Sequence, residues 1–181
     1  VGGTGNLQNN VAAGILTASD GDVNVTVRNL QGGGSTQIRT KAWAMRSSGA
    51  GTVTLTVQGP PPSSTINPLA VSALLRGGVD YSGLGGGAEI NLTSNSAWEV
   101  TRDSVFGGGA DVVNIASGAY LHLINFRTEG IISVPSDRSV LNFAGGDDRV
   151  VNAGTVIVGV DEYYVGGARQ GVDRYEGELW L

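Results

Sequence analysis

The sequence contains no cysteine, so disulfide bonds, thiolate zinc sites and cysteine nucleophiles are excluded. It also contains no apolar run of roughly 18 residues, and nothing in it predicts a membrane-spanning helix. No secretory signal peptide is recognisable. Residues 1–5 and 178–181 resemble the interior of a protein, and we expect both ends to be cuts through a longer polypeptide.

Charged and aromatic residues are scarce. Charged residues make up 15% of the chain, against about 25% in average proteins, and aromatic residues make up 6%. The formal net charge is −5, and the basic residues form no stripe along the sequence. We therefore expect neither nucleic acid nor an anionic membrane surface as a partner.

Glycine is abundant, with 30 of 181 residues. Because 40% of the residues are hydrophobic and fall in short clusters, the composition does not predict disorder. Three glycine tracts stand at residues 32–34, 85–87 and 107–109, and none precedes the Lys-Ser/Thr pair of a phosphate loop. We expect these tracts to form tight corners with positive φ angles.

Alternation of apolar and polar residues predicts β-strands. Residues 22–28, 51–57 and 89–93 each place Val, Leu or Ile on one face and Asn, Thr or Arg on the other. This period of two, bounded by Gly, Asn and Ser, is typical of a half-buried strand. Residues 69–75 also predict a strand, and no segment longer than two turns has helical spacing. We expect an all-β protein.

The predicted strands repeat. Gly21 and Gly51 are 30 residues apart in matching surroundings, Ala13 and Ala42 are 29 apart, and a third copy begins at Val71. Further on, the similar stretches 123–126 and 140–143 lie 17 residues apart, which predicts one tight coil of a β-solenoid. We expect a single solenoid segment over residues 1–181, with Gly/Pro-rich loops protruding near 60–68, 77–87 and 161–176.

The segments 21–27, 51–57 and 148–159 resemble passenger repeats of bacterial type V autotransporters. The resemblance covers most of residues 11–159 and implies a right-handed parallel β-helix displayed at the outer membrane or secreted. In that family the roles include adhesion, self-association and carriage of an enzyme domain. The family's C-terminal membrane barrel is missing from this sequence, and membrane attachment would come only through such a barrel.

Few residues predict chemistry. The single histidine, His122, alternates with Leu121 and Leu123, and we expect it on an outer strand face rather than in a catalytic group. Asp147 and Asp148 after two glycines faintly match a calcium-binding β-roll repeat, but the tandem pattern is missing, and a solvated turn is the stronger interpretation. Calcium binding there stays open, and no cofactor is predicted.

Two groups of charged residues are candidates for a carbohydrate-active site, since parallel β-helices also house lyases and glycoside hydrolases. Asp111 and Asp148 form one group if the coils stack, and Glu99, Arg102 and Asp103 form the other. Solvated charge at glycine-rich turns is the stronger interpretation of both.

The most favoured binding surface lies near the C-terminal end, where tyrosines and arginines gather. These are the residue types that most often anchor interfaces. The surface consists of Tyr163, Tyr164, Arg169, Arg174 and Tyr175. The competing interpretation is that these side chains cover the end of the stack or contact a further coil.

We expect a non-enzymatic scaffold on the bacterial cell surface or in the extracellular space, used for adhesion or self-association. Its partners would be a host or neighbouring cell, a glycan, or a second copy through the solenoid ends or edges. The first alternative is a self-assembling extracellular filament or surface-layer subunit. The second is a carbohydrate-active β-helix enzyme, which would bring three or more Asp, Glu or Arg side chains together on one lateral face.

Overall fold

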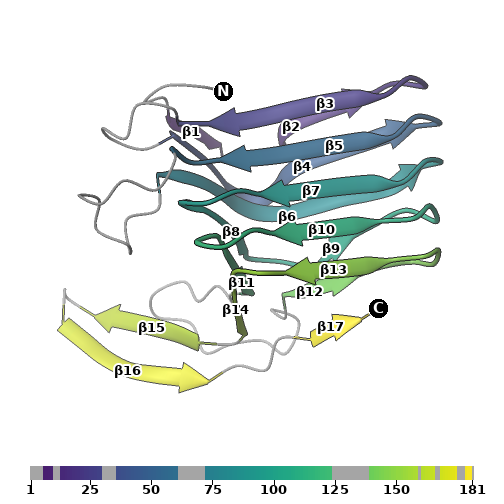
Figure 1. Cartoon of the computed structure of the whole chain (residues 1–181). Coiled ribbons are helices and arrows are strands. Elements are labelled where there is room, and N and C mark those ends of the chain that lie inside the picture. The colour runs from purple at the N-terminus through teal and green to yellow at the C-terminus, as the bar shows by residue number, and fades with distance from the viewer. Residues whose placement is uncertain are drawn as a thin grey trace.

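The computed structural model describes residues 6–9, 13–29, 36–60, 72–123, 139–158, 160–165, 168–174 and 178–180 (Figure 1). In these segments the protein is all-β, without a helix, and its main strands run parallel in two sheets. It follows that no helix in the described segments is long and apolar enough to cross a membrane.

The front sheet is a stack of five parallel strands, which Figure 1 shows one above another. From one edge to the other these are β3 (Val23–Arg28), β5 (Val53–Gln58), β7 (Ala88–Leu92), β10 (Val112–Ile115) and β13 (Arg149–Asn152). The three alternating segments of the sequence therefore form β3, β5 and β7, as predicted. Their apolar residues point inward, with β5 alternating strictly between buried and half-buried positions.

The back sheet contains two runs of stacked parallel strands, joined by the long strands β4 (Thr36–Gly49) and β6 (Ala73–Leu84). The first halves of β4 and β6 belong to run one, with β1 (Asn6–Asn9), β8 (Ser96–Val100), β11 (Tyr120–Leu123) and β14 (Thr155–Val158). Their second halves belong to run two, with β2 (Ala13–Ala18), β9 (Ser104–Val105), β12 (Val140–Asn142) and β17 (Glu178–Trp180).

The chain passes through run one, run two and the front sheet in the same order five times, from β1–β2–β3 to β11–β12–β13. We call each such passage a visit. Successive front strands pair Val23 with Val53, Val53 with Ala88, Glu89 with Val112, and Val112 with Arg149. The corresponding sequence offsets are 30, 35, 23 and 37 residues. The predicted period of about thirty residues therefore describes the first step, and the later steps vary on both sides of it.

The predicted 17-residue coil is wrong. Strand β12 pairs with β9 and β17, whereas β11 pairs with β8 and β14. The two similar stretches are therefore successive strands of one visit rather than stacked neighbours. The match of Ala13 with Ala42 is also one residue out, because Ala13 pairs with Trp43 and thereby places Ile15 opposite the buried Met45.

Two of the predicted protruding loops contain strands. Most of the segment 77–87 belongs to β6, where Gly77, Gly78 and Val79 are buried against neighbouring strands rather than looped out. The segment 161–176 forms an antiparallel pair, β15 (Val160–Val165) with β16 (Ala168–Arg174). The loop expected at 60–68 lies outside the described residues except for Pro60, which is buried. Of the strand expected at 69–75, the described part, Ala73–Leu75, opens β6.

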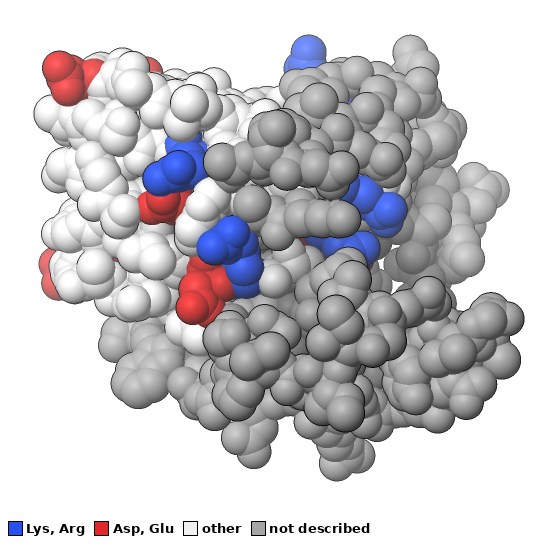
Figure 2. Space-filling model, turned by 180° about the vertical axis from the view of Figure 1, so that it is seen from behind, with Lys and Arg blue, Asp and Glu red and all other residues white. Residues whose placement is uncertain are grey.

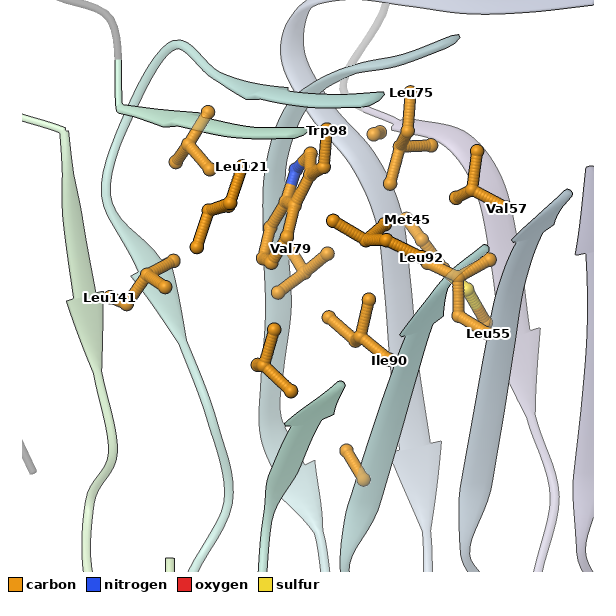
Figure 3. Close-up of a cluster of buried hydrophobic side chains, with 14 of the residues drawn as sticks. Met45, Leu55, Val57, Leu75, Val79, Ile90, Leu92, Trp98, Leu121 and Leu141 are labelled. Atoms are coloured by element: carbon orange, nitrogen blue, oxygen red, sulfur yellow. The ribbon is translucent and has the colours of Figure 1, made fainter. Parts of the chain in front are cut away.

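The core lies between the sheets as columns of side chains from successive visits (Figure 3). In run one, Ile38, Leu75, Trp98 and Leu121 follow one another in register, and each is at most 1% exposed. The Trp98 indole N–H donates a 2.9 Å hydrogen bond to the carbonyl of Gly77. Each such side chain contributes about 1.5–3 kcal/mol by leaving water.

An aromatic column runs beside it. Phe106 stacks on Phe143 with ring centroids 4.4 Å apart, and it meets Tyr81 edge to face at 5.9 Å. The Tyr81 hydroxyl contacts the Met45 sulfur at 3.4 Å. Because these four residues come from four successive visits, each step shares its core with the next.

The corner between run two and the front sheet, which we call the tight corner, is a column of glycines. A Cβ on Gly51 would lie 2.2 Å from the Gly21 carbonyl oxygen, and one on Gly146 would lie 2.2 Å from that of Gly109. The glycines at 85–87 and 107–109 have no positive φ, which corrects the prediction for those tracts. Glycine is required in these tracts chiefly for close approach of stacked backbones. The tract at 32–34 lies outside the described residues.

Candidate functional site

The predicted binding residues lie on the β15–β16 hairpin. The strand register places Tyr164 opposite Arg169, Tyr163 opposite Gly171 and Arg174 opposite Val160, while Tyr175 lies outside the described residues. The hairpin brings one tyrosine and one arginine into cross-strand positions. These directly opposed positions keep the hairpin a candidate binding element, since tyrosine and arginine are the residue types that most often anchor interfaces.

The hairpin stands at a defined point of the winding. It follows β14 of run one and precedes β17 of run two, so it occupies the corner between these runs. We call this position the variable corner, because a single long strand passes through it in β4 and β6, whereas residues 101–103 and 124–138 connect the runs further on.

A row of ionisable side chains borders the variable corner. Arg39, Arg76, Glu99 and His122 follow one another in register at the end of run one. The Nε atom of Arg76 lies 3.4 Å from the Glu99 carboxylate. His122 alternates with the buried Leu121 and Leu123, as predicted for an outer-face position. Figure 2, the view from behind, shows charged side chains gathered on the back of the molecule.

Arg102 lies in the connection between run one and run two, at residues 101–103. Its guanidinium carbon lies 3.8 Å from the centroid of a Trp43 ring, which is a cation–π contact between two visits. The Cγ atom of Arg102 covers Gly78, where a Cβ would come within 2.8 Å of it. The predicted group of Glu99, Arg102 and Asp103 is therefore divided, because Glu99 pairs with Arg76 instead.

The neighbouring Asp103 is electrostatically linked to Arg102. Desolvation raises the pKa of Asp103, while a hydrogen bond from the Val140 backbone N–H and the Arg102 charge oppose this rise. The positive and negative charges at the corner are thus interleaved, with three arginines and two carboxylates among the described residues.

A separate ion pair lies on run two. Arg46 Nε lies 2.9 Å from Asp80 Oδ2, next to a hollow of about 250 Å³ that the exposed Leu16 also lines. Desolvation raises the pKa of Asp80, but hydrogen bonds from Ser82 and the Arg46 pair outweigh it and hold the pKa below its usual value. The Asp80 carboxylate is therefore already held by Arg46 and Ser82.

The outer face of the front sheet carries a shallow groove of about 530 Å³. Asn114 Nδ2 donates to Glu89 Oε1 at 3.0 Å and to Asn91 Oδ1 at 2.8 Å, so the neighbouring strands β10 and β7 share one polar network on this face. Arg149 lines the same groove. Glu89 is the only carboxylate among its lining residues, so the groove lacks the paired carboxylates of the common glycosidase mechanism.

Asp111 and Asp148 come together, as the sequence predicts for stacked coils. Asp148 Oδ1 accepts a 2.9 Å hydrogen bond from the Asp111 backbone N–H, and Asp111 Oδ1 accepts one of 2.6 Å from Ala88. Asp111 is fully buried, and its Oδ2 has no hydrogen-bond partner. Burial and the nearby Asp148 charge raise the pKa of Asp111 to about 6.

These hydrogen bonds give the two aspartates a structural role in joining successive visits at the tight corner. Asp22 acts similarly at the other end of the stack, where it accepts hydrogen bonds from both the backbone and the hydroxyl of Thr52. In the described part of the chain, no three His, Cys, Asp or Glu side chains are grouped so that they could hold a metal ion.

The sequence did not predict that Arg39 and Arg76 are neighbours, because they lie 37 residues apart and no local pattern links them. Only the register of β4 on β6 reveals that they are neighbours. No protein-family model, curated protein or solved structure matches this chain.

Proposed function

We propose that this chain is a right-handed parallel β-solenoid that serves as a non-enzymatic scaffold for adhesion or self-association at the bacterial surface. The resemblance of its repeats to autotransporter passengers supports this proposal. Right-handed connection between parallel strands is the strong general preference.

The observation that carries the proposal is the constant order of visits. Each passage supplies one strand to run one, one to run two and one to the front sheet, and every described pairing between visits is parallel. Side-chain columns such as Tyr81, Phe106 and Phe143 then continue from visit to visit. A stack of this kind presents long lateral faces, which suit binding more than they suit an enclosed active site.

Adhesion is tested by fusing the chain to an outer-membrane barrel and measuring attachment of the displaying cells to glycan-coated and cell-coated surfaces. The double variant Tyr164→Ala/Arg169→Ala should reduce attachment, because it removes a cross-strand pair from the hairpin. The matched control Asn24→Ala, on the exposed face of β3, should leave attachment unchanged. Attachment that is equal with and without the displayed chain would contradict the proposal.

The enzyme alternative is tested on the same material. This alternative requires charged residues grouped on one lateral face, and Arg39, Arg76 and Glu99 occupy opposed positions on three neighbouring strands, with the Arg76 and Glu99 side chains paired. Purified protein should release no reducing ends or unsaturated sugars from a panel of polysaccharides. Turnover that Glu99→Gln or Glu89→Gln abolishes would replace the scaffold function by an enzymatic one.

Self-assembly is the second candidate, and the open edge of the front sheet favours it. Strand β3 pairs only with β5 among the described strands, so its other side offers a template for a further strand. Electron microscopy of the purified chain should then show fibres that Asn24→Lys at this edge suppresses. Uniform single particles at high concentration would exclude this candidate.

A further inference from the structure

We propose that the variable corner binds the carboxylate groups of an acidic polysaccharide through Arg39, Arg76 and Arg102. This inference deepens the proposed function by naming a ligand class, and it rests on that function only for the biological setting. The site itself is argued from the side chains of three successive visits.

The arginines are neighbours because of the strand register. Arg39 pairs directly with Arg76 in the β4–β6 ladder, and adjacent strands of a sheet are about 4.8 Å apart. Like charges at directly opposed positions of neighbouring strands repel each other, and an anion beside them relieves this repulsion. Glu99 lies in register on the far side of Arg76, and its carboxylate contacts Arg76 rather than Arg39.

Two of the three guanidinium groups keep a buried nitrogen without an acceptor. The Nε atoms of Arg39 and Arg102 are shielded from water and have no hydrogen-bond partner in the structure. Because these Nε atoms are shielded, a ligand carboxylate meets the two arginines through their terminal Nη groups, with short, charge-assisted bonds. Trp43 fixes Arg102 through the cation–π contact, so this guanidinium is held in place before any ligand arrives.

The interleaved carboxylates decide which polyanion fits. Glu99 lies beside Arg76 and Asp103 beside Arg102, and both carboxylates accept hydrogen bonds but donate none, so they favour a ligand that carries hydroxyl donors next to its anionic groups over a phosphodiester chain. A polyuronate offers carboxylates to the planar arginine forks and hydroxyl groups that donate to Glu99 and Asp103.

The experiment is calorimetric titration of the purified chain with polygalacturonate at two salt concentrations. Neutral galactan, dextran sulfate, single-stranded DNA and inorganic sulfate serve as parallel probes. We expect polygalacturonate to bind with a salt-dependent affinity, galactan not to bind, and dextran sulfate and DNA to bind more weakly than polygalacturonate.

Variants locate the site. Arg39→Gln and Arg102→Gln should each weaken polygalacturonate binding by about tenfold or more, and Arg39→Lys should lose less than Arg39→Gln. Arg28→Gln is the matched control, because it removes one positive charge from the exposed face of β3. Circular dichroism of every variant checks that the fold is retained.

Equal binding by wild type and Arg39→Gln, equal losses in Arg39→Gln and Arg28→Gln, or equal affinity for DNA would overturn the site. Such a result leaves the scaffold function standing if displayed cells still attach through the hairpin. Conversely, polygalacturonate binding by a chain that mediates no attachment supports the site and contradicts the adhesive function.

Discussion

The two corners of each visit differ in almost every respect. The tight corner, between run two and the front sheet, stacks glycine on glycine, and its aspartates accept backbone N–H groups from the neighbouring visit. The variable corner, between run one and run two, ranges from an uninterrupted strand in β6 to a connection that contains the β15–β16 hairpin. Three arginines gather around it, and two of these keep a buried nitrogen without an acceptor.

The contrast separates a corner that is fixed by backbone packing from a corner whose connection is free to change. At the tight corner several glycines lie so close to the backbone of the neighbouring visit that a Cβ on Gly51, Gly109 or Gly146 would clash with it. At the variable corner the chain changes length from visit to visit, and the register of β4 on β6 shifts there between Arg39 and Met45. Loops that vary on a rigid scaffold are where binding residues are usually found.

The largest effect is expected from filling the tight corner. Gly109→Ala places a Cβ 2.6–2.7 Å from backbone atoms of Gly86 and Gly87, which cannot move without opening the stack. We expect a loss of about 3 kcal/mol in unfolding free energy, measured by urea denaturation.

Gly108 provides the control for this substitution. A Cβ there meets nothing within 4 Å, so Gly108→Ala should stay within about 0.5 kcal/mol of the wild type. Equal losses at the two adjacent glycines would show that stacking contacts do not constrain this corner.

The second effect is a gain in stability. Since the pKa of Asp111 rises from 3.8 to about 6 on folding, the folded state holds its proton more tightly. Stability is then highest below pH 3.8 and falls as the pH rises to about 6. Asp111→Asn should flatten this window and stabilise the protein by about 1 kcal/mol at pH 7. Thermal melts from pH 3.5 to 7.5 check it, and an unchanged slope between pH 4 and 6 would refute it.

A smaller effect is expected at the variable corner. Arg102→Gln removes the cation–π contact with Trp43, and we expect a loss of about 0.5–1 kcal/mol in unfolding free energy. The same variant should reduce the affinity for polygalacturonate strongly, so a large loss of binding would accompany only a small loss of stability. A loss as large as that of Gly109→Ala would mean that both corners hold the fold together.

The smallest effect belongs to Asp22, and its pH dependence has the opposite sign to that of Asp111. Hydrogen bonds from the Thr52 hydroxyl and backbone lower the pKa of the exposed Asp22 carboxylate. Its stabilisation is present above pH 3.8 and is lost as the pH falls through the lowered pKa. Asp22→Asn should therefore have a slightly lower melting temperature than the wild type at pH 7 and the same melting temperature in strong acid. A difference that grows on acidification would contradict this assignment.

The strands of the front sheet were predictable because each alternates locally between apolar and polar residues. Strands β3, β5 and β7 show this pattern plainly, and the offset of 30 residues from Gly21 to Gly51 matches the register of β3 on β5. The long strand β6 was not predictable in full, because its glycines at 77 and 78 imitate a loop. They are needed there because Arg102 and the Asp103 carbonyl lie against Gly78.

The candidate binding site was less accessible from sequence. Tyrosines and arginines at 163–174 are visible as a local cluster, and the structure places four of them on one hairpin. The neighbouring positions of Arg39 and Arg76 depend instead on how strands that are distant in the sequence pair with each other. That information lies in register, and shifts at Arg39/Trp43 and Trp43/Met45 show that the register itself is irregular near the corner.

The hydrogen bonds between the strands of the front sheet all run in the direction in which the visits are stacked. Tension applied along that direction loads the hydrogen bonds of one rung at a time, since each strand contacts only the strands directly before and after it. A tethered molecule of this kind would unzip from its end in small steps at low force. A pull along the strands would instead shear a whole rung at once, so the direction of loading decides how much force the fold withstands.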